Sequence, residues 1–169
     1  MIGLRDEHRS DAPYLRKIVR EAFDRDTEAR IVDLARQRHE VIYSIVAEID
    51  GKLVGHVLVT PMKLEPDKGL RCIAIGPIAV TPEHQGNGIG SKLMQEVIER
   101  AREDGVDAIL LLGNPRYYHR FGFRTAPVGN EYGAGEEFMA LQLNAGCLDS
   151  IGGTCMARYI KAFSEAESS

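Results

Sequence analysis

The stretch Gln85-Gly86-Asn87-Gly88-Ile89-Gly90-Ser91 decides the fold of this 169-residue chain. It follows an apolar run over residues 73–80 and precedes an amphipathic run over residues 92–102. A strand, a glycine-rich turn and a helix in this order leave several backbone N–H groups unpaired at the start of the helix. Together with the positive end of the helix dipole, these donors form a site suited to a phosphate group. The sequence therefore predicts a phosphorylated ligand at residues 85–91.

Length and composition indicate one globular domain over residues 1–169. Hydrophobic residues make up 44% of the chain and charged residues 27%, and the net charge of −4 provides no basic field that would attract nucleic acid. No run approaches the roughly 20 apolar residues that cross a bilayer. Residues 1–10 also lack the apolar core of a secretory signal. We therefore expect neither nucleic acid nor a membrane as a partner.

The cysteines and histidines indicate an intracellular protein without a metal. Cys72, Cys147 and Cys155 are odd in number and widely spaced, which is typical of free thiols in a reducing compartment. No CxxC or HxxxH spacing occurs, and the five histidines are scattered. We therefore expect a cytoplasmic protein and no metal site.

Apolar periodicity and turn residues predict a mixed α/β order. Asp50-Gly51 is a strong hairpin signal, and Gly55 marks a possible bulge in the returning strand. The other expected elements are helices at residues 11–23, from Thr27, at 91–104 and at 115–121, strands at 44–49, 53–60, 70–80, 107–112 and 138–143, a loop at 61–69, a strand or helix at 154–163, and a frayed tail at 164–169. Together they predict an α/β domain with a mixed central sheet and flanking helices.

Three kinds of phosphate-binding loop compete for the glycine-rich stretch. A Walker A loop requires Gly-Lys-Ser/Thr, whereas Gly90 is followed by Ser91 and then Lys92. A Rossmann fingerprint requires G-x-G-x-x-G after the first strand, whereas this run is G-x-G-x-G in the middle of the chain. A pyrophosphate loop of the form Gln/Arg-x-x-Gly-x-Gly/Ala fits Gln85, Gly88 and Gly90 without adjustment. A tight turn with a helix-packing contact is the alternative that needs no ligand.

Two motifs carry a resemblance to a known family. Residues 80–93 resemble motif A of the GCN5-related N-acetyltransferases (GNAT), and Tyr118-His119-Arg120-Phe121-Gly122-Phe123 is similar to the family's later Tyr-x-x-x-Gly-Phe signature. One expected helix and one expected strand separate the motifs, as that fold requires. Residues 113–123 further resemble a bacterial subgroup, the YhbS-like predicted acetyltransferases. The resemblance covers residues 2–125 well and the remainder loosely.

The resemblance implies a single-domain GNAT-like fold that uses acetyl-CoA as co-substrate. Gly76-Pro77 lies inside an apolar strand, where proline cannot donate to a sheet. In the family this strand splays from its neighbour, and the pantetheine arm of the cofactor enters the gap. By this resemblance, an N–H near Ile78 polarises the thioester carbonyl. The implied cofactor-binding residues are Ile78, Ala79 and Val80 for the pantetheine arm, and Gln85, Gly86, Asn87, Gly88, Ile89, Gly90 and Ser91 for the pyrophosphate.

Acetyl transfer to an amine requires a proton for the leaving thiolate, and a tyrosine hydroxyl can supply it. Tyr118 lies four residues before Gly122, where the family places this acid. Its alternative role is that of a packed aromatic residue, and Tyr117 is the fallback acid. The general base stays open between four side chains, Glu48, His56, Glu83 and His84, and an ordered water, which serves in many family members.

The expected reaction is direct transfer of an acetyl group from acetyl-CoA to a primary amine of a small molecule or a protein. A non-catalytic acyl-CoA-binding or sensing module and a transferase of another acyl group are the alternatives, because a fold does not fix substrate chemistry. In this family the acceptor is bound by segments that correspond to residues 14–40 and 130–145, and residues 129–135 are expected to be flexible. A homodimer is also compatible with the family.

Overall fold

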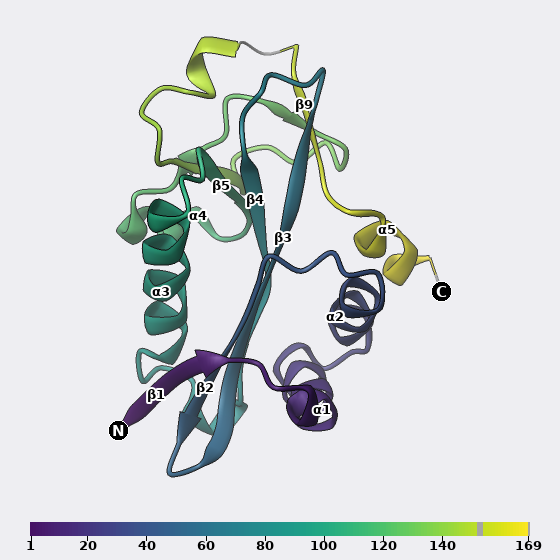
Figure 1. The fold of residues 1–169 in the computed structure, drawn as a ribbon, viewed down its shortest axis with the longest axis vertical. Helices are drawn as coiled ribbons and strands as arrows, with labels where there is room; N and C mark the ends of the chain where they lie inside the picture. The colour runs from purple at the N-terminus through teal and green to yellow at the C-terminus, as the bar shows by residue number, and fades with distance from the viewer. Residues whose placement is uncertain (152–153, 169) are drawn as a thin grey trace. The chain divides into compact units, whose positions relative to one another are not determined.

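The computed structural model describes residues 1–151 and 154–168 (Figure 1). The chain forms two compact units. Unit 1 comprises Met1–Thr60, Gly76–Val97 and Lys161–Ser169, and unit 2 comprises Pro61–Ile75 and Ile98–Ile160. Two strands and one helix pass from one unit into the other along the chain, so each unit contains part of β3 (Lys52–Glu65), β4 (Cys72–Val80) and α3 (Ile89–Glu103).

Unit 1 is an antiparallel sheet with helices on both faces. The strand β1 (Ile2–Asp6) pairs with β2 (Tyr43–Ile49), which pairs with β3. The helices α1 (Ala12–Phe23) and α2 (Thr27–Gln37) lie on one side of these strands and the start of α3 on the other (Figure 1). Apolar residues of α1 pack against this sheet and the end of β4 in a core that includes Leu15, Ile18, Val19, Ala29, Val46 and Ala79.

Unit 2 contains the parallel part of the sheet. The strand β4 pairs in parallel with β5 (Ala108–Leu112), and β5 pairs antiparallel with β8 (Phe138–Gln142). The remaining strands are β6 (Arg124–Thr125) beside β8, and β7 (Gly129–Asn130) and β9 (Met156–Arg158), of which β9 also pairs with the end of β3. The helix α4 (Pro115–Tyr118) follows β5. The sheet is therefore mixed, as the sequence predicts.

The predicted hairpin is confirmed. Asp50 and Gly51 both have positive φ angles, of 50° and 78°, and β3 begins at the next residue. The register of β2 against β3 shifts where Ala47 faces Gly55 and Glu48 faces Leu53, which leaves one extra residue in β3. The bulge predicted at Gly55 is therefore present.

Several boundaries differ from the prediction. The strand β1 is absent from the prediction because only its residues Ile2 and Leu4 are apolar, and residues 61–65, expected in a loop, continue β3. In that extension Met62 and Leu64 are buried, while Pro61 and Lys63 are exposed. The remaining differences are smaller: α3 begins at Ile89 instead of Ser91, and residues 154–163 contain first β9 and then the start of a helix. The helix α2 begins at Thr27 as expected, with Asp26 at its N-cap position.

The tail expected to fray over residues 164–169 instead continues α5 (Lys161–Glu167); Ser169 lies outside the described residues. Ala162 and Ala166 are buried, and Glu165 forms an ion pair with Arg38, the residue that follows α2. The helix was missed because it packs through two alanines rather than through a stripe of large apolar side chains, so its sequence pattern is weak.

We expect Ala166→Arg to lower the free energy of unfolding by about 1–3 kcal/mol, because a long charged side chain would enter a packed interface. Urea denaturation would measure this change. Ser164→Arg, at an exposed position of the same helix, is the control and should change stability by less than about 0.5 kcal/mol. Equal stability of the two variants would show that α5 does not pack in solution.

Candidate active site

The glycine-rich loop leads directly into α3 and presents its first amides. At this end of the helix, Lys92 N donates to Gly88 O over 3.1 Å in an i→i−4 hydrogen bond. The amides of Ile89 and Gly90 belong to the first turn, in which a helix provides no acceptor of its own. These donors point out of the start of a 15-residue helix and favour an anion there.

Two glycines give the loop its shape. Gly86 and Gly88 both have φ angles of +81°, a region that residues with a side chain rarely adopt. A Cβ atom added to either glycine would meet no atom of the described residues within 4 Å. The loop backbone is therefore open to close approach by a ligand, and the conformation that makes it so depends on glycine.

Side-chain hydrogen bonds fasten the loop to the end of β4. Gln85 Nε2 donates to the carbonyl of Val80 over 3.0 Å, and Thr81 Oγ1 lies 2.8 Å from His84 Nδ1. The Val80 carbonyl therefore already accepts a hydrogen bond within the protein. Ile78 and Ala79 are the other two residues predicted to contact the pantetheine arm through their backbone. All the predicted cofactor residues lie in one continuous segment of unit 1, from the end of β4 to the first turn of α3.

Tyr118, the predicted acid, lies at the end of α4 in unit 2. Its ring packs edge-on against Tyr117 and Phe123, with centroid separations of 4.9 and 6.1 Å. A Cβ atom added to Gly113 would lie 2.2 Å from the Tyr118 ring, so the ring rests directly on this glycine. Burial, and then the neighbouring Tyr117, raise the pKa of the Tyr118 hydroxyl. The hydroxyl makes no hydrogen bond to any described residue, so its proton is available and the group stays protonated at neutral pH.

Tyr117, the fallback acid, has a more occupied environment. The guanidinium of Arg120 lies 4.4 Å from the centre of the Tyr117 ring, and Arg120 Nε donates to the Tyr117 carbonyl over 2.9 Å. Phe121 packs edge-on against the same ring. Tyr117 therefore buttresses Tyr118, consistent with the packed role that the sequence suggested for its position.

Three of the four candidate bases have other functions or lie in the open. Glu48 forms an ion pair with Arg5 at 3.3 Å, and His84 is bonded to Thr81. Glu83 is exposed on the turn before the loop.

His56, the fourth candidate, is fully buried on β3. Its Nε2 lies 2.8 Å from Ser44 Oγ, while its Nδ1 has no partner among the described residues. Burial, and then Arg36, lower the pKa of His56 to about 3, so the imidazole is neutral. A buried acceptor without a donor destabilises a fold by about 1–3 kcal/mol, which makes His56 an exception that requires an explanation.

The loop expected to be flexible at residues 129–135 is held by a buried side chain. Asn130 Oδ1 accepts from the amides of Tyr132 and Ala134, and Asn130 Nδ2 donates to the Ala134 carbonyl. The side chain of Asn130 thus fixes the turn from inside. These hydrogen bonds give the turn at residues 129–135 a fixed conformation instead of the flexibility expected from the sequence.

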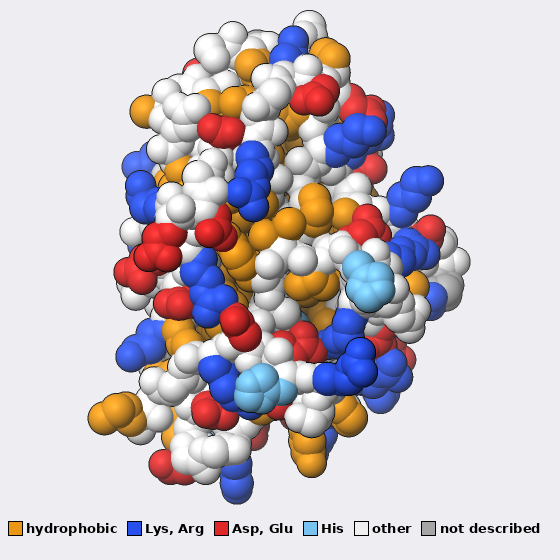
Figure 2. All heavy atoms as spheres, in the orientation of Figure 1, with side chains coloured by type: hydrophobic (Ala, Val, Ile, Leu, Met, Phe, Trp, Pro, Cys, Tyr) orange, Lys and Arg blue, Asp and Glu red, His pale blue; other side chains and the backbone are white. Residues whose placement is uncertain are grey.

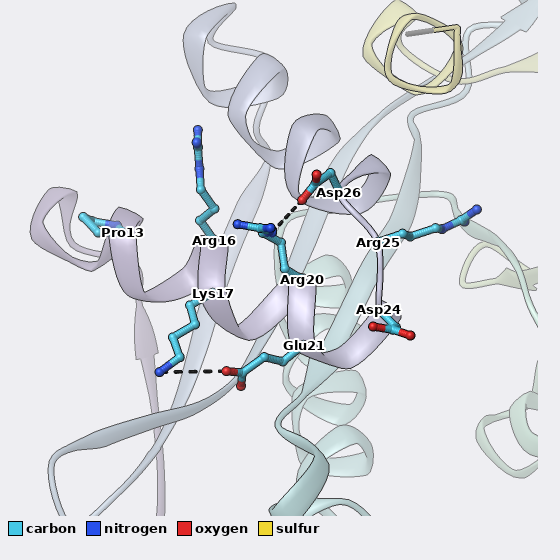
Figure 3. Close-up of a pocket in the computed structure, with 8 residues that line it drawn as sticks. All are labelled: Pro13, Arg16, Lys17, Arg20, Glu21, Asp24, Arg25 and Asp26. Carbon is cyan, nitrogen blue, oxygen red and sulfur yellow. Dashed lines mark ion pairs between the residues drawn. The ribbon is translucent and has the colours of Figure 1, made fainter.

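The hollows of unit 1 lie over the predicted acceptor-side helices. The larger, of about 620 Å³, is lined by Pro13, Arg16, Lys17, Arg20, Glu21, Asp24, Arg25 and Asp26 (Figure 3). Ion pairs join Lys17 to Glu21 and Arg20 to Asp26 across it (Figure 3). Positive and negative side chains are intermixed over α1 and α2 (Figure 2). This hollow contains no predicted cofactor or catalytic residue, so its size alone does not mark the active site.

A second hollow, of about 490 Å³, adjoins the start of the loop. Its lining includes Tyr14 and Lys17 of α1, Lys52 at the tip of the hairpin, and Thr81 and Glu83. From the sequence, Tyr14 and Lys17 are predicted only as members of the broad acceptor segment at residues 14–40. No local pattern indicates that α1 lies beside residues 51–53 and 81–83.

Comparison with known proteins decides the family. The model of the acetyltransferase (GNAT) domain matches residues 4–126. The chain belongs to the GNAT family. The predicted family and the activity class, an acyltransferase, are therefore confirmed. Within the described residues there is no group of His, Cys, Asp and Glu that could hold a metal ion, and no helix has the length and apolar character to cross a membrane.

The relatives agree with this assignment. The uncharacterized N-acetyltransferase YjhQ of Escherichia coli is 38% identical over 119 residues, which cover 68% of this chain and 65% of YjhQ. YhbS of E. coli is 32% identical over 117 residues, covering 69% of this chain and 70% of YhbS. The crystal structure of YhbS with CoA superposes with a TM-score of 0.89, at 27% identity over 96% of this chain and 92% of that one. The crystal structure of a GNAT family acetyltransferase of Brucella melitensis with acetyl-CoA superposes with a TM-score of 0.73, at 33% identity, and covers 84% of this chain and 88% of that one.

We expect Gly88→Ala to raise the dissociation constant for acetyl-CoA about tenfold, because the left-handed backbone is strained by a Cβ that would also enter the ligand's approach. Isothermal titration would measure the affinity. Gly133→Ala is the matched control, since Gly133 also has a positive φ, of +63°, and open surroundings. Unchanged affinity in Gly88→Ala would remove the loop from the cofactor site.

We also expect His56 to make stability depend on pH. The folded-state pKa is about 3 and the unfolded value about 6.5, so between them the unfolded chain binds a proton that the folded chain does not. Stability should therefore fall as pH drops below 6.5, by at most about 1.4 kcal/mol per pH unit from this group. Urea denaturation at pH 7, 6 and 5 should show a flatter profile for His56→Leu. Parallel profiles would contradict the burial of a neutral imidazole.

Proposed function

We propose that the chain transfers an acetyl group from acetyl-CoA to a primary amine by direct attack, with Tyr118 protonating the leaving thiolate. The observation that carries the proposal is the glycine-rich loop, whose open backbone precedes the first amides of α3 in a chain of the GNAT family. YhbS binds CoA and the Brucella protein binds acetyl-CoA in their solved structures, which supports acetyl-CoA as the donor.

The donor half of the reaction is assigned to the backbone of unit 1. The amides of residues 85–91 hold the pyrophosphate at the start of α3, where the helix dipole adds to the hydrogen bonds. The backbone of Ile78 and Ala79 pairs with the pantetheine arm, and an N–H near Ile78 polarises the thioester carbonyl. These groups need no ionisable side chain, so donor binding should vary little with pH near neutrality.

Protonation of the leaving thiolate is assigned to Tyr118. As the neutral amine nitrogen bonds to the acetyl carbon, the C–S bond breaks and its electron pair passes to sulfur. The Tyr118 hydroxyl proton moves to sulfur, the acylated nitrogen releases its surplus proton to solvent, and solvent later returns a proton to the phenolate. A raised pKa keeps this proton in place until the thiolate forms, and the absence of a hydrogen-bond partner among the described residues leaves the hydroxyl able to turn toward it.

The acceptor is an amine of a small molecule or of a protein. The alternative, a non-catalytic acyl-CoA-binding module, requires the glycine loop but not a packed tyrosine with an unengaged hydroxyl. Release of free CoA during incubation of the chain with acetyl-CoA and a broad panel of amines separates the two. Tight binding of acetyl-CoA without accelerated thiol release for any amine would favour the module, and release only with another acyl-CoA would favour a different acyl group.

We expect Tyr118→Phe to lower kcat about a hundredfold while the acetyl-CoA dissociation constant changes less than twofold, since only proton transfer is lost. Thiol release and isothermal titration measure the two quantities. Tyr117→Phe is the matched control, because it removes the neighbouring hydroxyl and retains the ring stack. A loss of kcat in Tyr117→Phe instead of Tyr118→Phe would reverse the assignment.

A further inference from the structure

A hydrogen-bonded chain fixes the protonation of His56. Ser44 Oγ donates to Glu7 Oε2 over 2.6 Å and lies 2.8 Å from His56 Nε2. A hydroxyl has one proton, and Glu7 receives it, so the Ser44 oxygen must accept from His56. His56 is therefore protonated on Nε2, and Nδ1 carries a lone pair that can accept a proton.

The Nδ1 lone pair has no partner inside the protein. His56 is 0% exposed, and no described residue donates to its Nδ1. The charged groups near it are themselves engaged: Glu7 pairs with Arg36, and Asp11 pairs with Arg5 at 2.8 Å. The ionic groups near the imidazole, from β1, the segment before α1 and α2, are thus paired with one another, and none of them donates to Nδ1.

The register of unit 1 places His56 against the predicted pantetheine strand. Thr81 N donates to Val54 O over 2.9 Å, and the position of a Gly55 Cβ would lie 3.3 Å from Ala79 O. Residue numbers therefore rise along β3 as they fall along β4, which sets His56 opposite Ala79. On its other side, His56 of β3 pairs with Val46 of β2. Val46 and Ala79 belong to the same core, which α1 covers.

We propose that His56 Nδ1 accepts the proton of the attacking amine, directly or across one bridging water, and that the Glu7–Ser44 pair keeps it in the tautomer that can do so. This assignment rests on the proposed acetyl transfer and supplies its general base. The C–N bond forms, the C–S bond breaks with its electron pair going to sulfur, and Tyr118 protonates sulfur. The surplus proton on nitrogen passes to Nδ1 and then to solvent, while solvent reprotonates Tyr118.

The electrostatics of the chain keep the His56 imidazole in its neutral form, which is the form that accepts a proton. The low pKa of His56 means that Nδ1 stays unprotonated throughout the neutral range, so the base is always in its active form. An amine that has bonded to a carbonyl carbon is a far stronger acid than a free ammonium ion, so it can transfer a proton to a weak base. Protonation on Nδ1 would strengthen the bonds from Nε2 through Ser44 to the Glu7 carboxylate, which offsets part of the cost that burial and Arg36 impose on the imidazolium.

The tautomer is tested first, because its measurement does not depend on activity. In protein labelled with 15N-histidine, the His56 ring should show a protonated Nε2 and a bare Nδ1, assigned by comparison with His56→Leu or, should that variant not fold, Ser44→Ala. Ser44→Ala should mix the two tautomers. Adding CoA and an amine that supports turnover should shift the Nδ1 resonance as a donor approaches. A protonated Nδ1, or an Nδ1 resonance unaffected by the amine, would overturn the assignment.

Kinetics of thiol release test the role itself. We expect His56→Leu to lower kcat at least tenfold with the KM for acetyl-CoA unchanged, and Ser44→Ala to lower it several-fold. Thr60→Val is the matched control, because Thr60 has the other buried side-chain atom without a partner, on the same strand, and should retain full kcat. Wild-type kcat in both single variants, Ser44→Ala and His56→Leu, would overturn the inference. If His56→Leu does not fold, the inference is overturned by a Ser44→Ala variant that retains full kcat and an unchanged His56 tautomer. A wild-type chain inactive toward all amines overturns the acetyl transfer instead, while the tautomer result stands.

Discussion

The first-turn amides of α3 are the constraint on which the rest of the site depends. They have no acceptor within their own helix, so they must meet solvent or an anion. For them to do so, the chain must leave β4, turn through Gly86 and Gly88 at positive φ, and enter the helix within a few residues. Gln85 and His84 complete the turn by bonding to Val80 and Thr81. A short run of backbone thus serves as a structural junction and presents the unpaired donors that the proposed anion site requires.

The same junction determines what lies on the two faces of β3. Toward α3, the space beside Gly55 is filled by Ile89 and Leu93, whose atoms would lie 3.0 and 3.2 Å from an added Cβ. Toward α1 and α2, the next residue is His56, which is buried beside a network of part-buried ionic groups. A strand covered on both faces usually consists of apolar residues alone. The polar residue at this position is stable because Glu7, Ser44 and Arg36 form a connected network around one of its two nitrogens.

The features that could be predicted from the sequence are those encoded by neighbouring residues. The glycine loop, the Asp50-Gly51 hairpin and the turn that ends at Gly122 each have a local signature, and each is present. The strand β1 and the helix α5 have no comparable signature, since they are stabilised by partners distant in the sequence, β2 and α2. The environment of His56 also has no local sequence signature, because the positions of Ser44 and Glu7 beside it depend on the register of three strands.

This difference between local and distant determinants follows the chemistry of the two substrates. A pyrophosphate and a pantetheine arm can be held by main-chain groups, whose placement depends on turns and strands that a short motif specifies. An amine must be recognised by side chains, and the segments that the family resemblance implies for it, residues 14–40 and 130–145, carry no short motif of their own. The proposed acid is an intermediate case: Tyr118 is found by its spacing from Gly122, yet its ring packs against Gly113, Tyr117 and Phe123. Donor binding is therefore the more local property of this chain, whereas acceptor choice is a tertiary one, and substitutions that alter acceptor choice need not touch the glycine loop.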